Sequence, residues 1–308
     1  MRKLLLFVAA LIALTGPARA DYLPVAEPVA DNVWAMVGPL AQRSPDNDGL
    51  NASFAFVVTD QGVILIDSGA SRKGAEKLAA AIRKVTPKPV RWVINTGSQD
   101  HRWLGNDFFA ERGADVLALT RTAATQAQYA EQHMLGLQKL LGARLAGTQP
   151  MPARHTSAGD RATLTLGGET LELIETDAHF PGDAMVWLPR QKVAVTGDLV
   201  FVDRLLGVLP MSSVRNGQRA FQALAALQPA RIVPGHGRVC DLAQAQRETG
   251  DYYDFLAGTL GRAAQDMEPM SDTLAKYADL PQFRDLENYA GLHKANMNRA
   301  FTEFEAAP

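Results

Sequence analysis

Residues 178–201 are AHFPGDAMVWLPRQKVAVTGDLVF, a stretch with two apolar runs, AMVWL and VAV, on either side of a polar turn. Runs of this length bounded by turn residues are typical of buried strands. His179 follows an earlier apolar run, ETLELIET, and Asp198 directly follows the second run, beside Gly197. Strand ends hold side chains on a rigid support, which is where α/β proteins commonly present functional groups. The stretch therefore predicts neighbouring strands that carry His179 and Asp198 as candidate site residues.

Three further apolar runs end in polar residues of the same kind. VILIDSG ends with Asp67, VRWVINTGSQDH leads to Asp100 and His101, and ARIVPGHG leads to His236. Imidazole and carboxylate are the ligands that zinc and iron take when sulfur is absent. Glycine beside such a residue lets the backbone approach an ion closely. A single histidine at a strand end is more often a core residue bonded to a carbonyl, so a metal site and a structural role both stay open. The remaining histidines are interpreted as surface or packing residues: His133, His155 and His293.

The N-terminus and the composition narrow the class of protein. Residues 1–20 have a basic start, an apolar run and a small-residue cleavage site, which predicts a signal peptide and a periplasmic or secreted mature chain from Asp21. An uncleaved anchor is the alternative; otherwise we expect no stable membrane insertion. The formal net charge is −2, which argues against a nucleic-acid partner. Cys240 is the only cysteine, so no internal disulfide forms; we expect a buried apolar side chain, with a thiolate metal ligand as the alternative.

The rest of the mature chain, residues 21–308, alternates between strand and helix patterns. FAFVVT, DQG and VILID form a predicted hairpin, followed by a helix that begins after a serine cap in SRKGAEKLAAAIRKV. Residues 120–146 have the pattern of a long helix, which is either ordinary packing or the lid of a cleft. The chain is mostly helical from about residue 241, with a C-terminal extension at about 260–308 that packs on the core.

In their order along the chain, these motifs resemble the metallo-β-lactamase superfamily over roughly residues 30–250. VVTDQGVILIDSG is similar to the family's first hairpin, with Asp67 as its supporting aspartate. AHFPGDAMVWLPRQKVAVTGDLVF is similar to the segment GHTPGD…GDLVF, and VPGHG to the last ligand motif. The resemblance implies metal-ligand roles for His179, Asp198 and His236. It also implies an α/β fold, a four-layer αβ/βα sandwich with the metal site along one edge between two sheets.

The chain departs from the family at NTGSQDHRWLGN, where the family pattern is N-T-H-x-H-x-D-H-x-x-G-N. Without a gap, Gly97 and Gln99 stand where two histidines bind the first metal, and His101 stands at the aspartate. With a shift of one residue, Asp100 and His101 align with the Asp-His pair. Both alignments place His101 in the site and remove the His-x-His pair.

The altered loop changes the expected ligand count. The first metal would keep His179, Asp198 and at best the amide oxygen of Gln99, so the resemblance implies at most one tightly held ion. That ion would bind three residues, His101, Asp198 and His236, and also Asp100 in the shifted alignment. Arg102 stands at the last histidine of the ungapped pattern. A guanidinium near a dication costs Coulomb energy, so Arg102 is expected either to meet an anionic substrate or to pair with Asp198 in a metal-free site.

The function that the resemblance implies is metal-dependent hydrolysis of a small-molecule ester, lactone, thioester or amide. One divalent metal, zinc with iron as the alternative, would activate a water molecule. Asp100 would orient that water or accept its proton, and His179 would bind the ion or stabilise the oxyanion. Two other functions stay open. One is a non-catalytic binding protein, which Gly97, Gln99 and Arg102 favour, and the other is a mononuclear iron oxidoreductase.

Overall fold

The computed structural model describes residues 22–306, in which twelve strands form two sheets. The predicted signal peptide, residues 1–20, lies outside the described residues. Seven strands form the first sheet in sequence order: β1 Ala26–Ala30, β2 Val33–Met36, β3 Phe54–Thr59, β4 Gly62–Ile66, β5 Val90–Ile94, β6 Asp115–Leu119 and β7 His155–Ser157. Five form the second sheet in the order β12-β11-β10-β9-β8: β8 Arg161–Leu166, β9 Glu169–Glu175, β10 Ala184–Leu188, β11 Val193–Val195 and β12 Arg231–Val233.

The first sheet is buried on both faces because both sides of its central strands are apolar. In β3, Phe54 and Phe56 pack in one core with helix α1 (Arg72–Val85), whereas Ala55 and Val57 pack in another core with the second sheet. Successive side chains of a strand point to opposite faces, so the run FAFVVT supplies two cores at once. The predicted hairpin is confirmed, since β3 and β4 pair antiparallel, and Ser71 caps α1 by accepting the N–H of Gly74.

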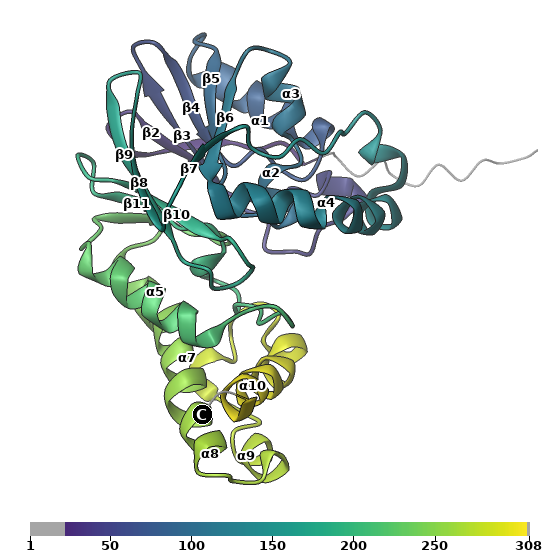
Figure 1. Cartoon of the computed structure of the whole chain (residues 1–308), viewed down its shortest axis with the longest axis vertical. Helices are drawn as coiled ribbons and strands as arrows, with labels where there is room; N and C mark the ends of the chain where they lie inside the picture. Colours follow the sequence, from purple (N-terminus) through teal and green to yellow (C-terminus); the bar gives the residue numbers. More distant parts are fainter. Residues whose placement is uncertain (1–21, 307–308) are drawn as a thin grey trace, which may run out of the picture.

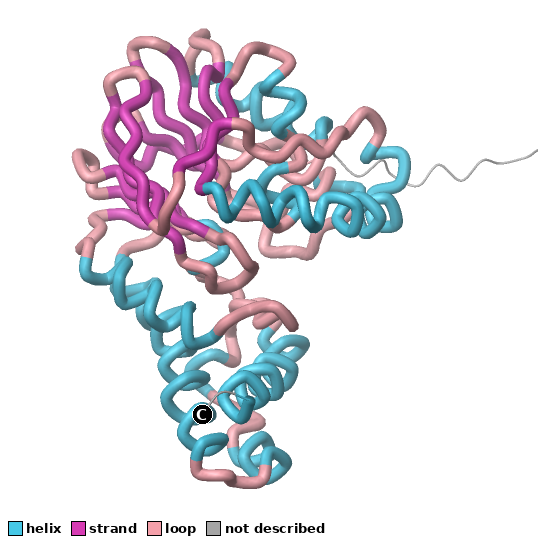
Figure 2. Tube along the Cα trace, viewed as in Figure 1, coloured by secondary structure: helices cyan, strands magenta, loops and turns pink. Residues whose placement is uncertain are grey.

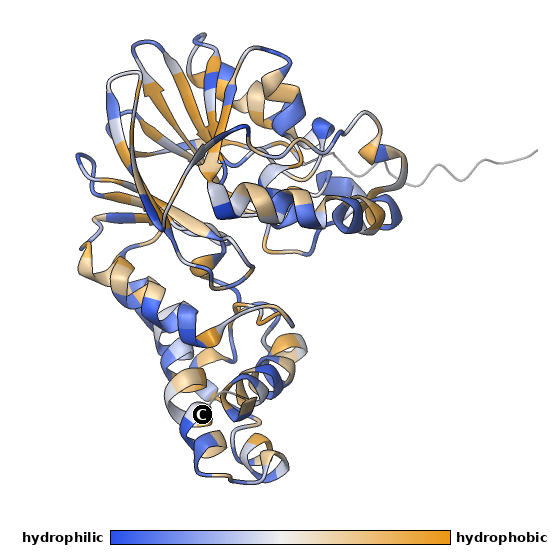
Figure 3. Cartoon of the chain, viewed as in Figure 1, coloured by the Kyte–Doolittle hydropathy of each residue, from blue (hydrophilic) through white to orange (hydrophobic). Residues whose placement is uncertain are grey.

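The second sheet repeats this arrangement on the other side of the shared core. In β10, Val186 faces the first sheet, whereas Met185 and Trp187 pack with Phe221 of helix α5 (Val214–Ala226). Figure 1 shows the resulting layers, with α1 outside one sheet and α5 outside the other. Figure 2 separates the strands from the helices around them, and Figure 3 shows apolar residues concentrated in the strands. The fold is the predicted four-layer α/β sandwich.

The remaining helices cover the loops of the sheets and form the C-terminal part of the chain. Between β5 and β7 lie α2 Asp100–Trp103, α3 Asn106–Ala110 and α4 Thr120–Leu141. The C-terminal helices are α6 Leu242–Ala245, α7 Asp251–Asp254, α8 Gly261–Gln265, α9 Met270–Lys276 and α10 Tyr289–Ala306, with π-helical turns at Gln246–Gly250 and Phe255–Leu260. These helices share one core with the second sheet and extend away from the sandwich (Figure 1). Among residues 22–306, no helix combines the length and apolar character needed to cross a membrane.

Two predictions about individual segments can be compared with this packing. Leu137 and Leu141 of α4 pack against Trp103 and Leu104 at the end of α2, so this part of the helix is core structure. That contact supports the packing interpretation of residues 120–146. Cys240 is a buried thiol, 2% exposed, in the core beside α5, as the apolar interpretation expects.

Candidate metal centre

Three predicted site residues converge at the ends of their strands. His101 lies on α2, Asp198 in the 3-10 turn Gly197–Leu199 after β11, and His236 after β12. Each offers a ligand atom, and these atoms lie within 4.8 Å of one another. His101 Nε2 is 3.0 Å from Asp198 Oδ2, and His236 Nε2 is 3.2 Å from Asp198 Oδ1. All three side chains are buried, so the sequence-distant strand ends form one compact donor set.

The hydrogen bonds around His236 leave its Nε2 free to bind an ion. Nδ1 lies 3.0 Å from the carbonyl oxygen of Asn51 and, as the donor, places the ring proton there. Burial lowers the pKa of His236 to about 3, against the opposing effect of Asp198, so the ring is neutral. The Nε2 lone pair then faces the Asp198 carboxylate, an arrangement that a cation between them makes favourable. The donor set therefore fits a divalent metal.

His101 is held through its Nδ1 in the same way as His236, but by the carboxylate of Asp100 in place of a backbone carbonyl. Its Nδ1 is 3.3 Å from Oδ1 of Asp100, and its Nε2 is buried with no hydrogen-bond partner among the described residues. Asp100 is also paired with Arg43. Burial raises the pKa of Asp100, but Arg43 and His101 lower it well below its usual range, so Asp100 is ionised and accepts a hydrogen bond from the Nδ1–H of His101. A histidine held by a carboxylate in this way presents its other nitrogen to a metal.

Arg102 is turned inward, where it pairs with two buried aspartates. Its Nη1 donates to Asp67 Oδ2 at 3.1 Å and to the carbonyl of Ser53 at 3.2 Å. Nε donates to Asp198 Oδ2 at 3.2 Å, and Nη2 donates to Asp198 Oδ1 and to the carbonyl of Gly235. The guanidinium has five N–H groups, so every donor has a partner. Of the two predicted alternatives, these contacts match the pairing of Arg102 with Asp198, which is the one expected of a metal-free site.

Asp67 holds the other side of this ion pair in a conformation that few side chains adopt. Its φ is 66°, in the left-handed region that aspartate tolerates better than most residues. The carboxylate accepts hydrogen bonds from the N–H of Thr96 at 2.7 Å and from its hydroxyl at 2.6 Å. These bonds tie the end of β4 to the end of β5 and fix the position of Arg102 between the strands.

The group of three donors does not include His179 or Asp100. The ring of Phe201 contacts both the His179 ring, at 5.4 Å between centroids, and the His236 ring, at 4.9 Å. Burial lowers the pKa of His179, against the opposing effects of Asp198 and of a hydrogen bond with the Gly207 backbone. His179 Nδ1 is buried and has no partner among residues 22–306. The structure thus places His179 beside the group with one nitrogen unused.

Other residues near the centre were not singled out by their sequence pattern. Arg43, which pairs with Asp100, lies in a loop without a recognisable motif. Arg204 is 6% exposed, has no carboxylate within 4 Å in the described part, and lies close enough to lower the pKa of His236. His133 of α4 is half-buried, and burial lowers its pKa against the opposing effect of the Asp100 charge. A side chain from a distant loop or helix carries no local signal of this placement.

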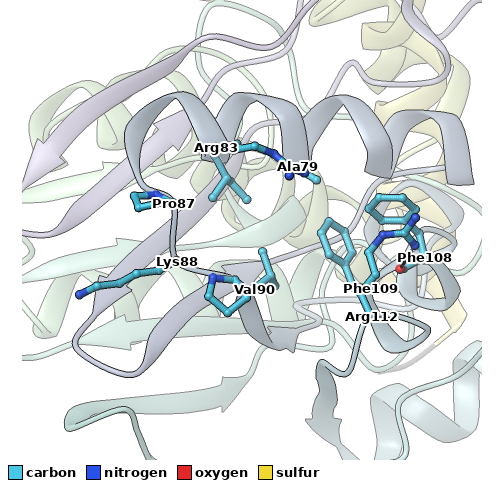
Figure 4. Close-up of a pocket in the computed structure, with 10 residues that line it drawn as sticks. Ala79, Arg83, Pro87, Lys88, Val90, Phe108, Phe109 and Arg112 are labelled. Carbon is cyan, nitrogen blue, oxygen red and sulfur yellow. Dashed lines mark hydrogen bonds between the residues drawn. The ribbon is translucent and has the colours of Figure 1, made fainter.

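A separate cavity of about 290 Å³ lies between α1 and α3, away from these residues. Phe108 and Phe109 line one side, and Arg83, Lys88 and Arg112 lie around it (Figure 4). None of the candidate metal ligands lines this cavity. It is therefore distinct from the centre formed by the strand ends.

Comparisons with known proteins agree with this geometry. The family described as the metallo-beta-lactamase superfamily matches residues 48–236. A metallo-beta-lactamase from Pontibacter korlensis is 21% identical over 75% of this chain and 99% of that chain, with a TM-score of 0.61. The metallo-beta-lactamase DIM-1 is 20% identical over 76% of this chain and 98% of that chain, with a TM-score of 0.57.

FIM-1 from Pseudomonas aeruginosa, solved in a mono-zinc form, is 16% identical over 76% of this chain and 96% of that chain, with a TM-score of 0.59. These likenesses concern the fold. A comparison with curated proteins found no match. The family match spans more than half of the chain and includes Asp198 and His236 at the candidate centre. The chain belongs to the metallo-β-lactamase superfamily.

Proposed function

We propose that the protein is a hydrolase that uses one divalent metal held by His101, Asp198 and His236. The observation that carries the proposal is that the Nε2 atoms of both histidines face one carboxylate within 3.2 Å. If these residues hold a zinc ion, it would supply a Lewis acid that lowers the pKa of a water molecule and polarises a carbonyl oxygen. The predicted signal peptide would place the reaction in the periplasm or outside the cell.

The protein's own groups support this chemistry in different ways. Asp100, held by Arg43, fixes the proton of His101 on Nδ1, which keeps Nε2 available as a ligand. Because Oδ1 of Asp100 contacts both His101 and Arg43, we propose that this oxygen acts through His101 and not on the water directly. His179 is a neutral imidazole whose Nδ1 has no protein partner, which suits it to accept a proton or to bind the ion.

The surrounding charge favours a substrate that carries an anionic group. Arg204 is buried without a carboxylate partner within 4 Å in the described residues. Its Nη1 donates to the carbonyl of Leu40 at 3.3 Å, whereas its Nε has no hydrogen-bond partner in that part of the chain. Burial lowers its pKa, against the opposing effects of Asp198 and Glu287. Desolvating a guanidinium without an anion is costly. We therefore propose an acyl substrate, such as an ester, lactone, thioester or amide, with a carboxylate that reaches Arg204.

A second candidate function follows from the same donor set. Two histidines and one carboxylate are also the ligands of mononuclear iron oxygenases. The identity of the metal in the purified protein separates an iron oxidoreductase from a zinc hydrolase. A chain without metal would instead favour the binding protein suggested by Gly97 and Gln99.

The test is elemental analysis of the mature protein, purified without chelator or affinity metal. We expect about one zinc per chain in the wild type and its loss in His236→Ala, with activity on lactones, thioesters or β-lactams lost in parallel. His155→Ala is the matched control, because His155 is 59% exposed and lies outside the donor set. Unchanged metal content in His236→Ala would overturn the assignment of this ligand.

A further inference from the structure

Residues 205–213, here called the strap, connect the candidate centre to the C-terminal helices. On the side of the centre, Ser212 donates from its hydroxyl to the carbonyl of His179 at 2.6 Å, and the Ser213 N–H donates to the carbonyl of Ala178 at 2.8 Å. Gly207 lies against the His179 ring, where an added Cβ would be 3.8 Å from Cε1. The strap is therefore in direct contact with the residue whose Nδ1 is unused.

On its other side the strap is held by one face of α10. The Asn296 side chain accepts the N–H of Val208 through Oδ1 and donates to the carbonyl of Leu206 through Nδ2, both at 2.8 Å. These two bonds bracket Gly207. Arg299 donates to the carbonyl of Val208, and the Glu303 carboxylate accepts the N–H of Val214, the residue after the strap, at 2.7 Å. Residues three, four and seven apart share a helix face, so α10 presents these groups together.

The amide of Asn296 is fixed by partners within the C-terminal helices. Asn296 is fully buried, and its Nδ2 also contacts the hydroxyl of Tyr252 at 3.3 Å. That hydroxyl is 2.9 Å from Nδ1 of His293, whose Nε2 is 2.9 Å from the carbonyl of Tyr277. The amide therefore cannot rotate without breaking a buried network, and such networks hold their members in one arrangement.

This network lies outside the part of the chain that the family match covers. The match ends at residue 236, whereas α10 begins at Tyr289. The solved relatives are matched over 96–99% of their own length but over only about three quarters of this chain. The residues that hold the strap therefore belong to a part of the chain that lies beyond the matched family region.

We infer that α10 positions the candidate active site, and that Asn296 is the positioning residue that holds Leu206–Val208 so that Gly207 stays against the ring of His179. Two side-chain bonds to adjacent peptide groups fix the strap much as a neighbouring strand would. A strap released from α10 leaves the His179 imidazole without a fixed neighbour on that side. An effect of Asn296 on catalysis rests on the proposed function, whereas its effect on the position of the strap and of the His179 ring does not.

The test compares Asn296→Leu with Asn298→Leu, an exposed position on the same helix whose amide contacts only the sulfur of Met270. Hydrogen exchange of the peptide that contains Val208 reports on the strap, and the ¹⁵N-histidine signal of His179, assigned with His179→Gln, reports on the ring. We expect exchange at Val208 to become at least tenfold faster in Asn296→Leu and the His179 signal to move. Asn298→Leu should match the wild type in both measurements, and zinc content should stay at the wild-type value in both variants.

If hydrolysis is detected, Asn296→Leu should lower kcat more than it changes KM, because the strap positions a residue and does not supply a ligand of the metal. Failure to detect any hydrolysis contradicts the proposed function and leaves the exchange and histidine signals as the test of α10. A folded Asn296→Leu with wild-type protection at Val208 and an unmoved His179 signal would overturn the inference. If Asn296→Leu does not fold, Asn296→Asp keeps the acceptor for Val208 and loses the donor to Leu206, and wild-type behaviour of that variant overturns the inference equally.

Discussion

Replacing Arg102 by methionine removes the guanidinium that lies between the buried carboxylates of Asp67 and Asp198. Arg102, Asp67 and Asp198 have side chains that are each 1% exposed, so water cannot take the place of the lost donors. Removing one partner of a buried ion pair costs about 3–5 kcal/mol, because the remaining charge stays buried without compensation. For a chain of this size, we expect Arg102→Met to lower the Tm of the metal-free protein by on the order of 10 °C.

The pH dependence of this loss follows from Asp198. Burial raises the pKa of Asp198, but Arg102 and His101 hold it well below its usual range. A depressed pKa in the folded state contributes stability above the unfolded value of about 3.9, and this contribution is lost as the pH falls through the folded value. Without Arg102 the folded pKa rises. The stability difference between variant and wild type is therefore largest near neutral pH. It shrinks as the pH falls, because Asp198 of the variant is protonated at a higher pH than Asp198 of the wild type.

Denaturant unfolding of the metal-free proteins between pH 3 and pH 8 measures this difference. Arg121→Met is the matched control, because Arg121 also contacts two carboxylates, Glu175 and Asp177, but is 53% exposed. An exposed pair is worth about 0–1 kcal/mol, so we expect the control to stay close to the wild type at every pH. The reasoning is refuted if Arg102→Met unfolds within about 1 kcal/mol of the wild type, or if the two variants lose the same stability.

Two further predictions concern the altered loop and His236. Gly97→His should not add a metal ion, because a Cβ at Gly97 would lie 2.7 Å from Asp183 Oδ1. We expect the metal content per chain to stay unchanged and the free energy of unfolding to fall by about 1–3 kcal/mol. Elemental analysis that shows an additional ion would contradict this. The pKa of His236 is about 3 in the fold and about 6.5 when unfolded, so the stability of the metal-free protein falls as the pH drops from 6.5 towards 3. His236→Gln should make the free energy of unfolding depend less on pH in a series of unfolding curves. An unchanged dependence would mean that other titratable groups cause it.

The family resemblance implies the sandwich and the ligand roles, and local patterns in the sequence agree with both. An apolar run such as FAFVVT is buried on both faces whatever its neighbours are, and it requires a layer on each side. Polar residues that follow parallel strands meet at the same sheet edge. β4 and β5 are parallel, as are β11 and β12, which places Asp67, His101, Asp198 and His236 together.

The inward orientation of the Arg102 side chain could not be predicted from the residues next to it in the sequence. Its inward position depends on Asp67, 35 residues earlier, and on Asp198, 96 residues later, and both pairings form only in the folded chain. The same applies to Asn296, which holds the strap from a helix 90 residues further along the sequence. His133 was interpreted as a surface or packing residue, and its neighbours in the fold, Tyr129 and Phe180, are packing partners. The proximity of His133 to Asp100 depends on where α4 crosses α2.

The ion pair between Arg102 and Asp198 agrees with the departure of this chain from the family motif. Asp67 accepts three hydrogen bonds, and Asp198 contacts Arg102 through both oxygens. A second dication beside Asp198 would compete with Arg102 for the same lone pairs and would stand within a few ångströms of its positive charge. The loss of the His-x-His pair and the inward arginine are thus consistent with each other, because a site that keeps Arg102 at Asp198 has no use for the first metal's ligands.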